Sequence, residues 1–217
     1  MDNNFAILRT EKLKTFGNIG GSLAHNFRDI ETPNADADRT IKNSHSLKSS
    51  AEVMDAIQLR LPEKRRYDAV LCIEHLITAS PTWSGWGTEK ENEFFENSKK
   101  WLEKQYGSKN VVAVSIHRDE TTPHLIAYVV PLDEATGKLN AKKWLDGRAK
   151  MSQMQSDFAD QVRSLGLERG VEGSKAKHTK IKEYYAKVNQ DEVEIQRNVF
   201  LPDAEYDEDK YMYAERC

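Results

Sequence analysis

The sequence predicts an α+β domain built on a central antiparallel sheet with helices packed against it. Short segments rich in Val, Ile and Leu alternate along the chain with longer segments whose apolar residues recur at helical spacing. Two of the strand segments, 111–117 and 124–131, are joined only by a short polar link, which is typical of an antiparallel hairpin. Separated strands with helices between them indicate a sheet that is covered on one face.

The first quarter of the chain is predicted to contain a strand, a turn, a short helix and a long loop. Residues 4–13 (NFAILRTEKL) form the expected strand, and GNIGG at 17–21 is expected to be a flexible turn. A short helix capped by Ser22 is expected over 22–30. Residues 32–50 are polar and rich in Asn, Asp and Ser, so we expect a long loop or a lid there.

The middle of the chain is predicted to supply a helix, a buried strand and a second helix. Apolar residues at helical spacing predict the first helix over 52–61, and a proline follows it. Residues 67–78 (YDAVLCIEHLIT) have the composition of a buried strand. Thr88 and Glu91 are spaced as a capping box, which predicts that a helix begins there and runs to about residue 106.

The carboxy-terminal part separates into basic and acidic stretches. Residues 138–150 are basic, 151–165 are predicted to form an amphipathic helix, and 174–188 a basic helix. Residues 189–217 carry nine acidic and three basic side chains, a net charge of -6, so the -3 of the whole chain leaves +3 on residues 1–188. We therefore expect a mildly basic folded domain over 1–188 and an acidic tail over 189–217.

The overall composition is that of a globular protein from a reducing compartment. The chain has 217 residues, enough for one domain with a tail. We expect neither a membrane span nor a signal peptide, because no apolar run is long enough and the first residues lack an apolar h-region. Cys72 and Cys217 do not make a disulfide framework, which favours the cytoplasm.

The segment HRDETTPH, residues 117–124, is the most informative in the chain. If its middle six residues turn the chain between two antiparallel strands, His117 lies directly opposite His124 on one face of the sheet. Two imidazoles placed in this way can bind one metal ion, and Asp119 or Glu120 in the turn can add a carboxylate. The alternative is a polar hairpin tip with two incidental histidines.

The same segment, followed by LIAYVVP, resembles the third motif of the MobV (Pre/Mob) plasmid mobilisation relaxases, His-x-Asp-Glu-x-x-Pro-His-x-His. Three further segments resemble family motifs in the same order. They are GNIGG…HNFR at 17–28, DAVLCIEHLIT at 68–78 and SKAKH at 174–178. The resemblance extends from roughly residue 5 to residue 188, so the predicted domain 1–188 would be the relaxase domain.

The resemblance implies an HUH-endonuclease-like fold, with a metal on one face of the antiparallel sheet and helices on the other. Such an enzyme binds hairpin and single-stranded DNA at a plasmid transfer origin, cuts one phosphodiester and stays joined to the 5′ phosphate. It would serve plasmid mobilisation or recombination. Other relaxosome proteins are possible partners, and no association with a membrane is implied. The implied nucleophile is His25, and His117, His124 and Glu120 would hold Mn²⁺ or Mg²⁺, with Glu120 also counted as catalytic.

Two positions depart from the family pattern. The second histidine of the family's metal strand falls at Ile126, which would lie on the same face as His124 with Ser115 as its cross-strand neighbour. The family often has Asn-Tyr where this chain has Asn43 followed by a serine and His45. We expect His45 to be a loop histidine in water; the alternative is that it substitutes for the missing aromatic residue. The loss at position 126 leaves open a second reading, a DNA-binding module of the same fold that no longer cuts.

Several other side chains are candidates for contact with DNA. Trp83, Trp86 and Trp144 could stack on unpaired bases, although core packing is their alternative use. Glu74 could support a metal-bound imidazole or be an exposed strand residue, and His75 is expected to be a core histidine. A third reading, a protein-interaction module that works through its acidic tail, predicts no DNA affinity. The residues predicted to bind DNA are Arg28, Asn43, Lys142, Lys143, Arg148 and Lys177, with Lys175, Lys180 and His178 as weaker candidates.

Overall fold

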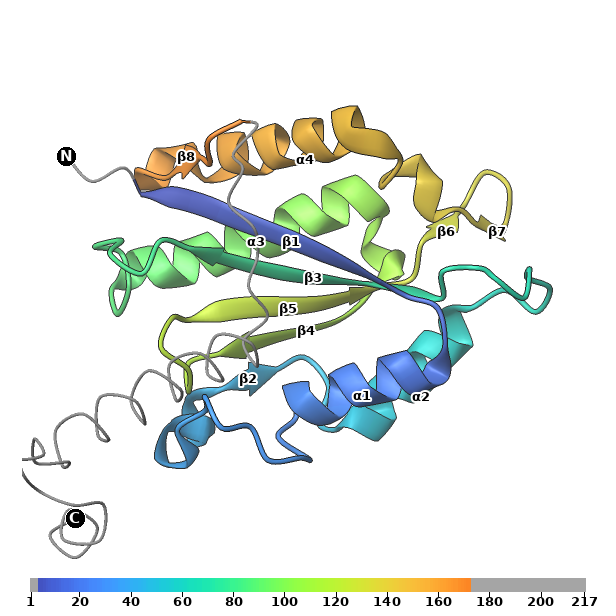
Figure 1. The fold of residues 1–217 in the computed structure, drawn as a ribbon, viewed down its shortest axis with the longest axis horizontal. Helices are drawn as coiled ribbons and strands as arrows, with labels where there is room; N and C mark the ends of the chain where they lie inside the picture. Colours follow the sequence, from blue (N-terminus) through green and yellow to red (C-terminus); the bar gives the residue numbers. More distant parts are fainter. Residues whose placement is uncertain (1–3, 173–217) are drawn as a thin grey trace, which may run out of the picture. The chain divides into compact units, whose positions relative to one another are not determined.

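A computed structural model describes residues 4–172, and the central element of this part is a six-stranded sheet with the order β2–β4–β5–β3–β1–β8 (Figure 1). Neighbouring strands are antiparallel except β1 and β8, which are parallel. A small hairpin of β6 and β7 follows β5. The strands are β1 (Phe5–Leu13), β2 (Ser44–His45), β3 (Cys72–Ala79), β4 (Val111–His117), β5 (His124–Val129), β6 (Leu132–Asp133), β7 (Lys138–Leu139) and β8 (Glu168–Arg169).

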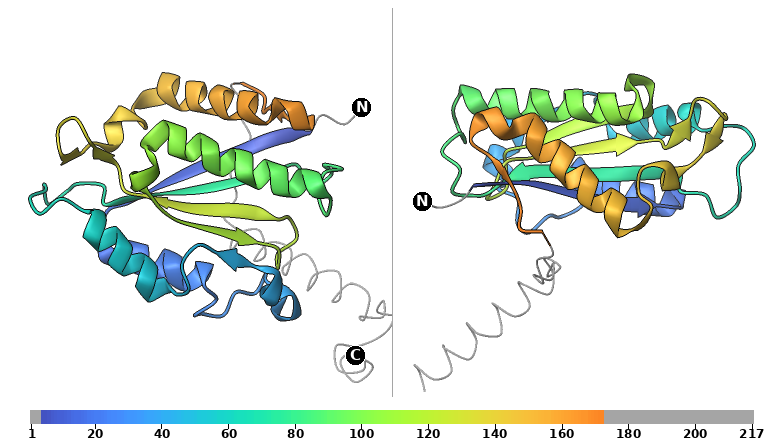
Figure 2. Two further views of the ribbon diagram at one scale, coloured as in Figure 1. Left: turned by 180° about the vertical axis from the view of Figure 1, so that it is seen from behind. Right: turned by 90° about the horizontal axis from the view of Figure 1, so that it is seen from above.

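One face of the sheet is covered by helices α3 (Glu89–Tyr106) and α4 (Gly147–Val162), which lie across it in Figure 2. Their aromatic residues, among them Phe94, Trp101 and Phe158, form a large apolar cluster with the strands. The helix start predicted at Thr88 is confirmed, since its side chain accepts a hydrogen bond from a main-chain N–H in the first turn.

The opposite face is covered by α1 (Phe16–Asn26) and α2 (Ser50–Arg60). The sheet therefore has helices on both faces, and the expectation that only one face is covered was wrong. The turn predicted over 17–21 was wrong as well, because these residues lie inside α1, whose N-cap is Thr15 rather than Ser22. Burial of two side chains of α1 against the sheet outweighs the roughly 1 kcal/mol helix penalty of each glycine.

The long polar segment after α1 is largely a loop, as predicted. It contains a 3₁₀ helix (Ala37–Lys42) and then the two-residue edge strand β2. The loop is tied to the β4–β5 connection, because the main-chain N–H of Asp36 donates to the carbonyl oxygen of Asp119 at 2.7 Å. This loop is thereby held over the end of the sheet at which the two predicted histidines lie.

Some expectations fall at or beyond the limits of the described part. No helix within residues 4–172 is long and apolar enough to cross a membrane. The basic helix predicted over 174–188, the acidic tail over 189–217 and the boundary between them lie outside the described residues. The same holds for Lys175, Lys177, His178 and Lys180.

Candidate active site

The β4–β5 hairpin places the two predicted histidines side by side. His117 pairs with His124, and Ser115 pairs with Ile126, so the register predicted from the sequence is confirmed. Both imidazoles lie on the face covered by α1, and both are buried. Residues 118–123 make the connection between the two strands.

Main-chain carbonyl groups fix which nitrogen of each imidazole carries a proton. Nε2 of His117 lies 2.9 Å from the carbonyl oxygen of Asn26, and Nδ1 of His124 lies 3.1 Å from that of Thr122. A carbonyl oxygen only accepts, so each of these nitrogens donates. The remaining nitrogens, Nδ1 of His117 and Nε2 of His124, are therefore lone-pair donors, and they face each other at 3.1 Å.

Two lone pairs aimed at one another call for a cation between them. A proton is a poor candidate, because burial, together with His124 and Arg28, lowers the pKa of His117 to about 3. Glu120 supplies a third potential metal ligand, since its Oε1 lies 3.8 Å from Nε2 of His124. Ligand atoms of His117, Glu120 and His124 all lie within 4.8 Å of one another, and this set of two nitrogens and one carboxylate fits a divalent transition metal such as Mn²⁺.

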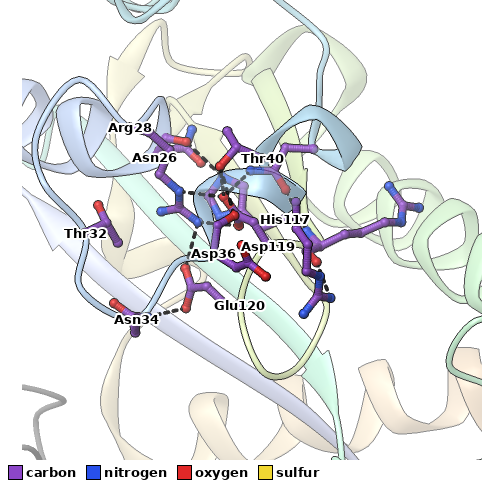
Figure 3. Close-up of polar contacts among 12 residues, drawn as sticks. Asn26, Arg28, Thr32, Asn34, Asp36, Thr40, His117, Asp119 and Glu120 are labelled. Carbon is purple, nitrogen blue, oxygen red and sulfur yellow. Dashed lines mark hydrogen bonds and ion pairs between the residues drawn. The ribbon is translucent and has the colours of Figure 1, made fainter.

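Glu120 is itself held in place by two donors from the segment that follows α1. Nη2 of Arg28 donates to its Oε1 at 2.8 Å, and Nδ2 of Asn34 donates to its Oε2 at 2.5 Å (Figure 3). Both donors restrict the rotation of the carboxylate and keep one of its oxygens near His124. The carboxylate is thus oriented before any ion arrives.

Asp119 does not join the imidazoles but is a buried hub of hydrogen bonds (Figure 3). Its carboxylate accepts two hydrogen bonds from the guanidinium of Arg28, at 2.7 and 3.0 Å, and others from Asn43 and Thr40. Although burial favours the neutral acid, these donors hold the pKa of Asp119 well below its usual range. Arg28 has a φ of 60°, the only positive value of a non-glycine residue in the described part, which indicates that this network stabilises a strained backbone.

The network engages two residues that are predicted to contact DNA. Arg28 and Asn43 were expected to contact DNA, but the structure engages both side chains with carboxylates and main chain inside the protein. Oδ1 of Asn43 accepts from the main-chain N–H of Arg118, so this residue clamps the start of the hairpin turn. Their partners lie about 75 to 92 positions away in the sequence, which is why sequence patterns alone did not indicate these contacts.

His25, the predicted nucleophile, lies exposed in the last turn of α1, one residue before Asn26. Its Nδ1 is 3.5 Å from the hydroxyl of Thr32. Partial burial and the positive charge of Arg28 lower the pKa of His25 below 6.5. The imidazole is therefore neutral near pH 7 and accessible, as a nitrogen nucleophile must be.

Ile126 and His45 occupy one row across the sheet, with Ser115 between them. Ile126 is buried among apolar residues beneath α1 and α2, so no third imidazole enters from β5. His45 is not the solvated loop histidine that we expected. It is half-buried, stacks on Phe27 with ring centroids 4.5 Å apart, and its Nδ1 lies 2.8 Å from Oγ of Ser115.

Other predicted residues have structural roles. His75 is a buried core histidine, as expected, and its Nε2 lies 2.9 Å from the hydroxyl of Tyr106. Within residues 4–172, Glu74 forms no hydrogen bond or ion pair with an imidazole, but it accepts a hydrogen bond from Ser22 of α1. The three tryptophans pack in or against the core rather than stand free for base stacking, and each indole donates to a main-chain carbonyl; they are Trp83, Trp86 and Trp144.

The predicted basic residues lie away from the paired histidines. Lys142, Lys143 and Arg148 follow β7, at the end of the sheet opposite the 118–123 turn (Figure 1). Lys143 forms an ion pair with Asp133 at 2.8 Å, so a phosphate at Lys143 would compete with that carboxylate.

An open groove of about 590 Å³ at the amino-terminal end of α1 was missed by the sequence analysis. The run of basic residues in EKRRY (63–67) was the available signal for it. Cationic and aromatic side chains in this groove are typical of nucleic-acid contacts. Its lining includes Lys14, Phe16, Lys64, Arg65, Arg66 and Tyr67.

The sequence of this chain is similar to those of known proteins. A family model described as "Plasmid recombination enzyme" (Mob_Pre) matches residues 2–186. A 65 kDa protein of Zymomonas mobilis is 40% identical over 86% of this chain, and a plasmid recombination enzyme of Streptococcus agalactiae is 32% identical over 83%. The chain spans only about a third of the length of the first and two fifths of the second.

Solved structures give the same answer for the fold. The MobM relaxase domain, in an Mn-bound crystal structure with a 22-nucleotide plasmid pMV158 oriT DNA, matches with a TM-score of 0.72 and 31% identity. The match covers 84% of this chain and 99% of that domain. Another solved structure of that domain, bound to a 26-nucleotide pMV158 oriT DNA, matches with a TM-score of 0.62. The chain therefore has the HUH-type fold and belongs to the Mob_Pre family of plasmid recombination enzymes.

Proposed function

We propose that this chain is a DNA relaxase that cuts one strand at a plasmid transfer origin and becomes joined to the new 5′ phosphate, in plasmid mobilisation or recombination. The observation that carries the proposal is that exposed His25 directly precedes Asn26, whose carbonyl oxygen accepts a hydrogen bond from His117 of the His117–Glu120–His124 set. The solved relatives bound to oriT DNA and Mn support the same substrate and ion. We expect the protein to act in the cytoplasm.

The chemistry is a transesterification at phosphorus. A nitrogen of neutral His25 attacks the scissile phosphate, a P–N bond forms, the P–O3′ bond breaks, and the 3′ oxygen leaves with the upstream strand. The imidazole releases its remaining N–H proton to water as the phosphoramidate forms, and the departing 3′ oxygen takes up a proton from water to become a hydroxyl. The link conserves the bond energy, so that a 3′ hydroxyl can later reverse the reaction.

A divalent ion, held by His117, His124 and Glu120, would act as a Lewis acid that stabilises negative charge on the phosphoryl oxygens. Arg28 and Asn34 keep the carboxylate of Glu120 oriented, and the carbonyl groups of Asn26 and Thr122 keep the imidazole lone pairs inward. None of these contacts uses residue 126. We therefore propose that these three residues bind the ion with isoleucine at position 126.

The proposed course of the DNA strand follows α1. This helix has 11 residues and is about 16 Å long, with His25 near one end and the basic groove at the other. A single strand of a few nucleotides spans such a distance. We therefore propose that DNA beyond the cut site contacts Lys14, Lys64 and Arg65 in the groove, in place of the internally engaged Arg28 and Asn43.

A second function is favoured by one observation, the buried Ile126 in place of a family histidine. If two imidazoles and one carboxylate bind the ion too weakly, the protein recognises an origin hairpin without cutting it. This binding module would show salt-sensitive, sequence-selective DNA binding and no product with any divalent metal.

A nicking assay separates the two functions. Supercoiled plasmid that carries the neighbouring DNA of this gene is incubated with the protein and Mn²⁺ or Mg²⁺, with EDTA as the control. The relaxase proposal predicts relaxed plasmid and a covalent protein–DNA band on a denaturing gel, both abolished by EDTA. DNA binding without either product would support the binding module instead.

A further inference from the structure

A chain of three polar side chains runs beneath the carboxy-terminal end of α1. Nδ2 of Asn26 donates to Oγ of Ser115 at 3.1 Å, and Oγ of Ser115 lies 2.8 Å from Nδ1 of His45. A serine hydroxyl has one proton, and because Oγ accepts from Asn26, it can give that proton to Nδ1 of His45. Asn26 and Ser115 are each only 2% exposed.

Asn26 connects this chain to both halves of the candidate active site. It directly follows His25, and its carbonyl oxygen is the acceptor for Nε2 of His117. The last carbonyl groups of a helix have no partner within the helix, so their position depends on outside contacts. Ser115 and His117 are two residues apart on β4 and therefore on one face, where Asn26 binds the first by its side chain and the second by its main chain.

The surroundings of Ser115 offer its hydroxyl few other hydrogen-bond partners. Its cross-strand partner on β5 is the apolar Ile126, and within residues 4–172 the hydroxyl bonds only to Asn26 and His45. The ring of His45 is held by stacking on Phe27 and by an edge contact with His117, with centroids 5.9 Å apart. Ile126, at the position where the family has a histidine, is thus flanked by the hydrogen-bonded pair of Ser115 and His45.

We propose that Ser115 and His45 are positioning residues that act through Asn26, fixing the end of α1 so that His25 and the ring of His117 keep their places. The expected effect on the nicking rate rests on the proposed function, whereas the expected effect on the tautomer of His117 does not. If the chain of hydrogen bonds is broken, Asn26 is free to shift, and both the nucleophile and the acceptor of His117 shift with it.

The first test uses metal-free protein without DNA. Nitrogen-15 NMR of the imidazole groups in the wild type should show His117 as a single tautomer protonated on Nε2. Ser115→Ala should lose this state, giving exchange between the Nε2–H and Nδ1–H forms. The matched control is Ser98→Ala, which removes another buried hydroxyl, one that donates to the carbonyl of Phe94 on α3, and it should leave His117 unchanged.

The second test measures the reaction in single turnover with saturating Mn²⁺ and DNA. Ser115→Ala should lower the nicking rate constant about 10- to 100-fold, the range found for partners of metal ligands, while the Kd for DNA changes less than about twofold. Ser98→Ala should match the wild type. Circular dichroism should first show that both variants are folded. A difference in nicking rate between two folded variants then cannot be attributed to unfolding.

A second variant keeps the proposal testable if Ser115→Ala does not fold. His45→Phe retains an aromatic ring against Phe27 but removes the acceptor, and it lies on a two-residue edge strand. It should disturb the His117 tautomer in the same direction, and in a folded double variant the two losses should not add, because one chain of bonds is broken in either case.

The outcomes separate the two proposals. A wild-type His117 tautomer in both variants, or a nicking rate equal to that of Ser98→Ala, overturns the positioning role. If the wild type does not nick at all but Ser115→Ala still alters His117, the proposed function fails and the positioning role stands.

Discussion

The carbonyl oxygen of Asn26, the last residue of α1, accepts a hydrogen bond from Nε2 of His117 at 2.9 Å. This contact joins the helix that carries His25 to the hairpin that carries the metal donors. It also orients the free Nδ1 of His117 toward His124. One main-chain group thus links the predicted nucleophile with the predicted metal site.

The pH dependence of nicking should report the ionisation of His25. Burial and Arg28 lower its pKa below 6.5, and only the neutral imidazole has a lone pair for attack. The single-turnover rate at saturating Mn²⁺ should therefore rise as pH increases through a value below 6.5 and be level by pH 7. A rate that still rises between pH 7 and 8 would contradict a neutral His25. DNA binding, measured separately at each pH, is the control.

Asp119 should be essential for stability. Asp119→Ala leaves the guanidinium of Arg28, whose side chain is 11% exposed, without its main partner. Removal of one member of a buried ion pair costs about 3–5 kcal/mol of the free energy of unfolding, which urea denaturation can measure. Asp160→Ala, which breaks the exposed pair with Arg163, is the control and should cost less than about 1 kcal/mol. Equal losses of unfolding free energy in the two variants would contradict the stabilising role of Asp119.

The stabilisation provided by the Asp119 carboxylate should depend on pH. Because the pKa of Asp119 in the folded protein is held below its usual range, its contribution to stability is present above about pH 4, near the ordinary pKa of aspartate. That contribution should be lost as pH falls further toward the folded value. Urea denaturation of the wild type and Asp119→Ala at pH 7 and pH 3 should show the gap between them shrinking. A constant gap would contradict this account.

Glu120 should be required for metal binding. Glu120→Gln removes the anionic oxygen that lies near His124, so the Kd for Mn²⁺, measured by calorimetry without DNA, should rise at least about tenfold. Glu93→Gln, an exposed change on α3, should leave it unchanged. If Mn²⁺ binds Glu120→Gln as tightly as the wild type, the carboxylate is not a ligand.

The groove at the start of α1 should contribute to DNA affinity through phosphate contacts. The double change Lys64→Ala and Arg65→Ala should weaken oligonucleotide binding and reduce the slope of log K against log salt by about 1.4, since each single-strand contact contributes about 0.7. The pair Lys99→Ala and Lys100→Ala on α3 removes the same charge from the other face of the sheet. Identical slopes for both double variants would exclude the groove from the DNA path.

Local patterns in the sequence were sufficient for the hairpin. The alternation of side chains along a strand fixes which residues share a face, so His117 opposite His124, and Ser115 opposite Ile126, follow once the turn is placed. The helix start at Thr88 follows from equally local chemistry. These features need no knowledge of what the rest of the chain does.

Features that depend on distant segments were not predictable in the same way. The three glycines of 17–21 suggest a turn, yet they lie in α1, where Gly20 faces Met54 of α2. The pairing of Arg28 with Asp119 spans 91 positions, so its basic charge looked available for phosphate. His45 looked like a loop residue because its edge strand has only two residues and forms against β4.

The most direct test of the account is to locate the covalent link. The protein is trapped on a single-stranded origin oligonucleotide in Mn²⁺, digested, and the nucleotide-bearing peptide is sequenced by mass spectrometry. The account predicts an acid-labile phosphoramidate on His25 and no adduct in His25→Ala, with the Kd for DNA retained. An adduct on any other residue, or one that survives in His25→Ala, would contradict it.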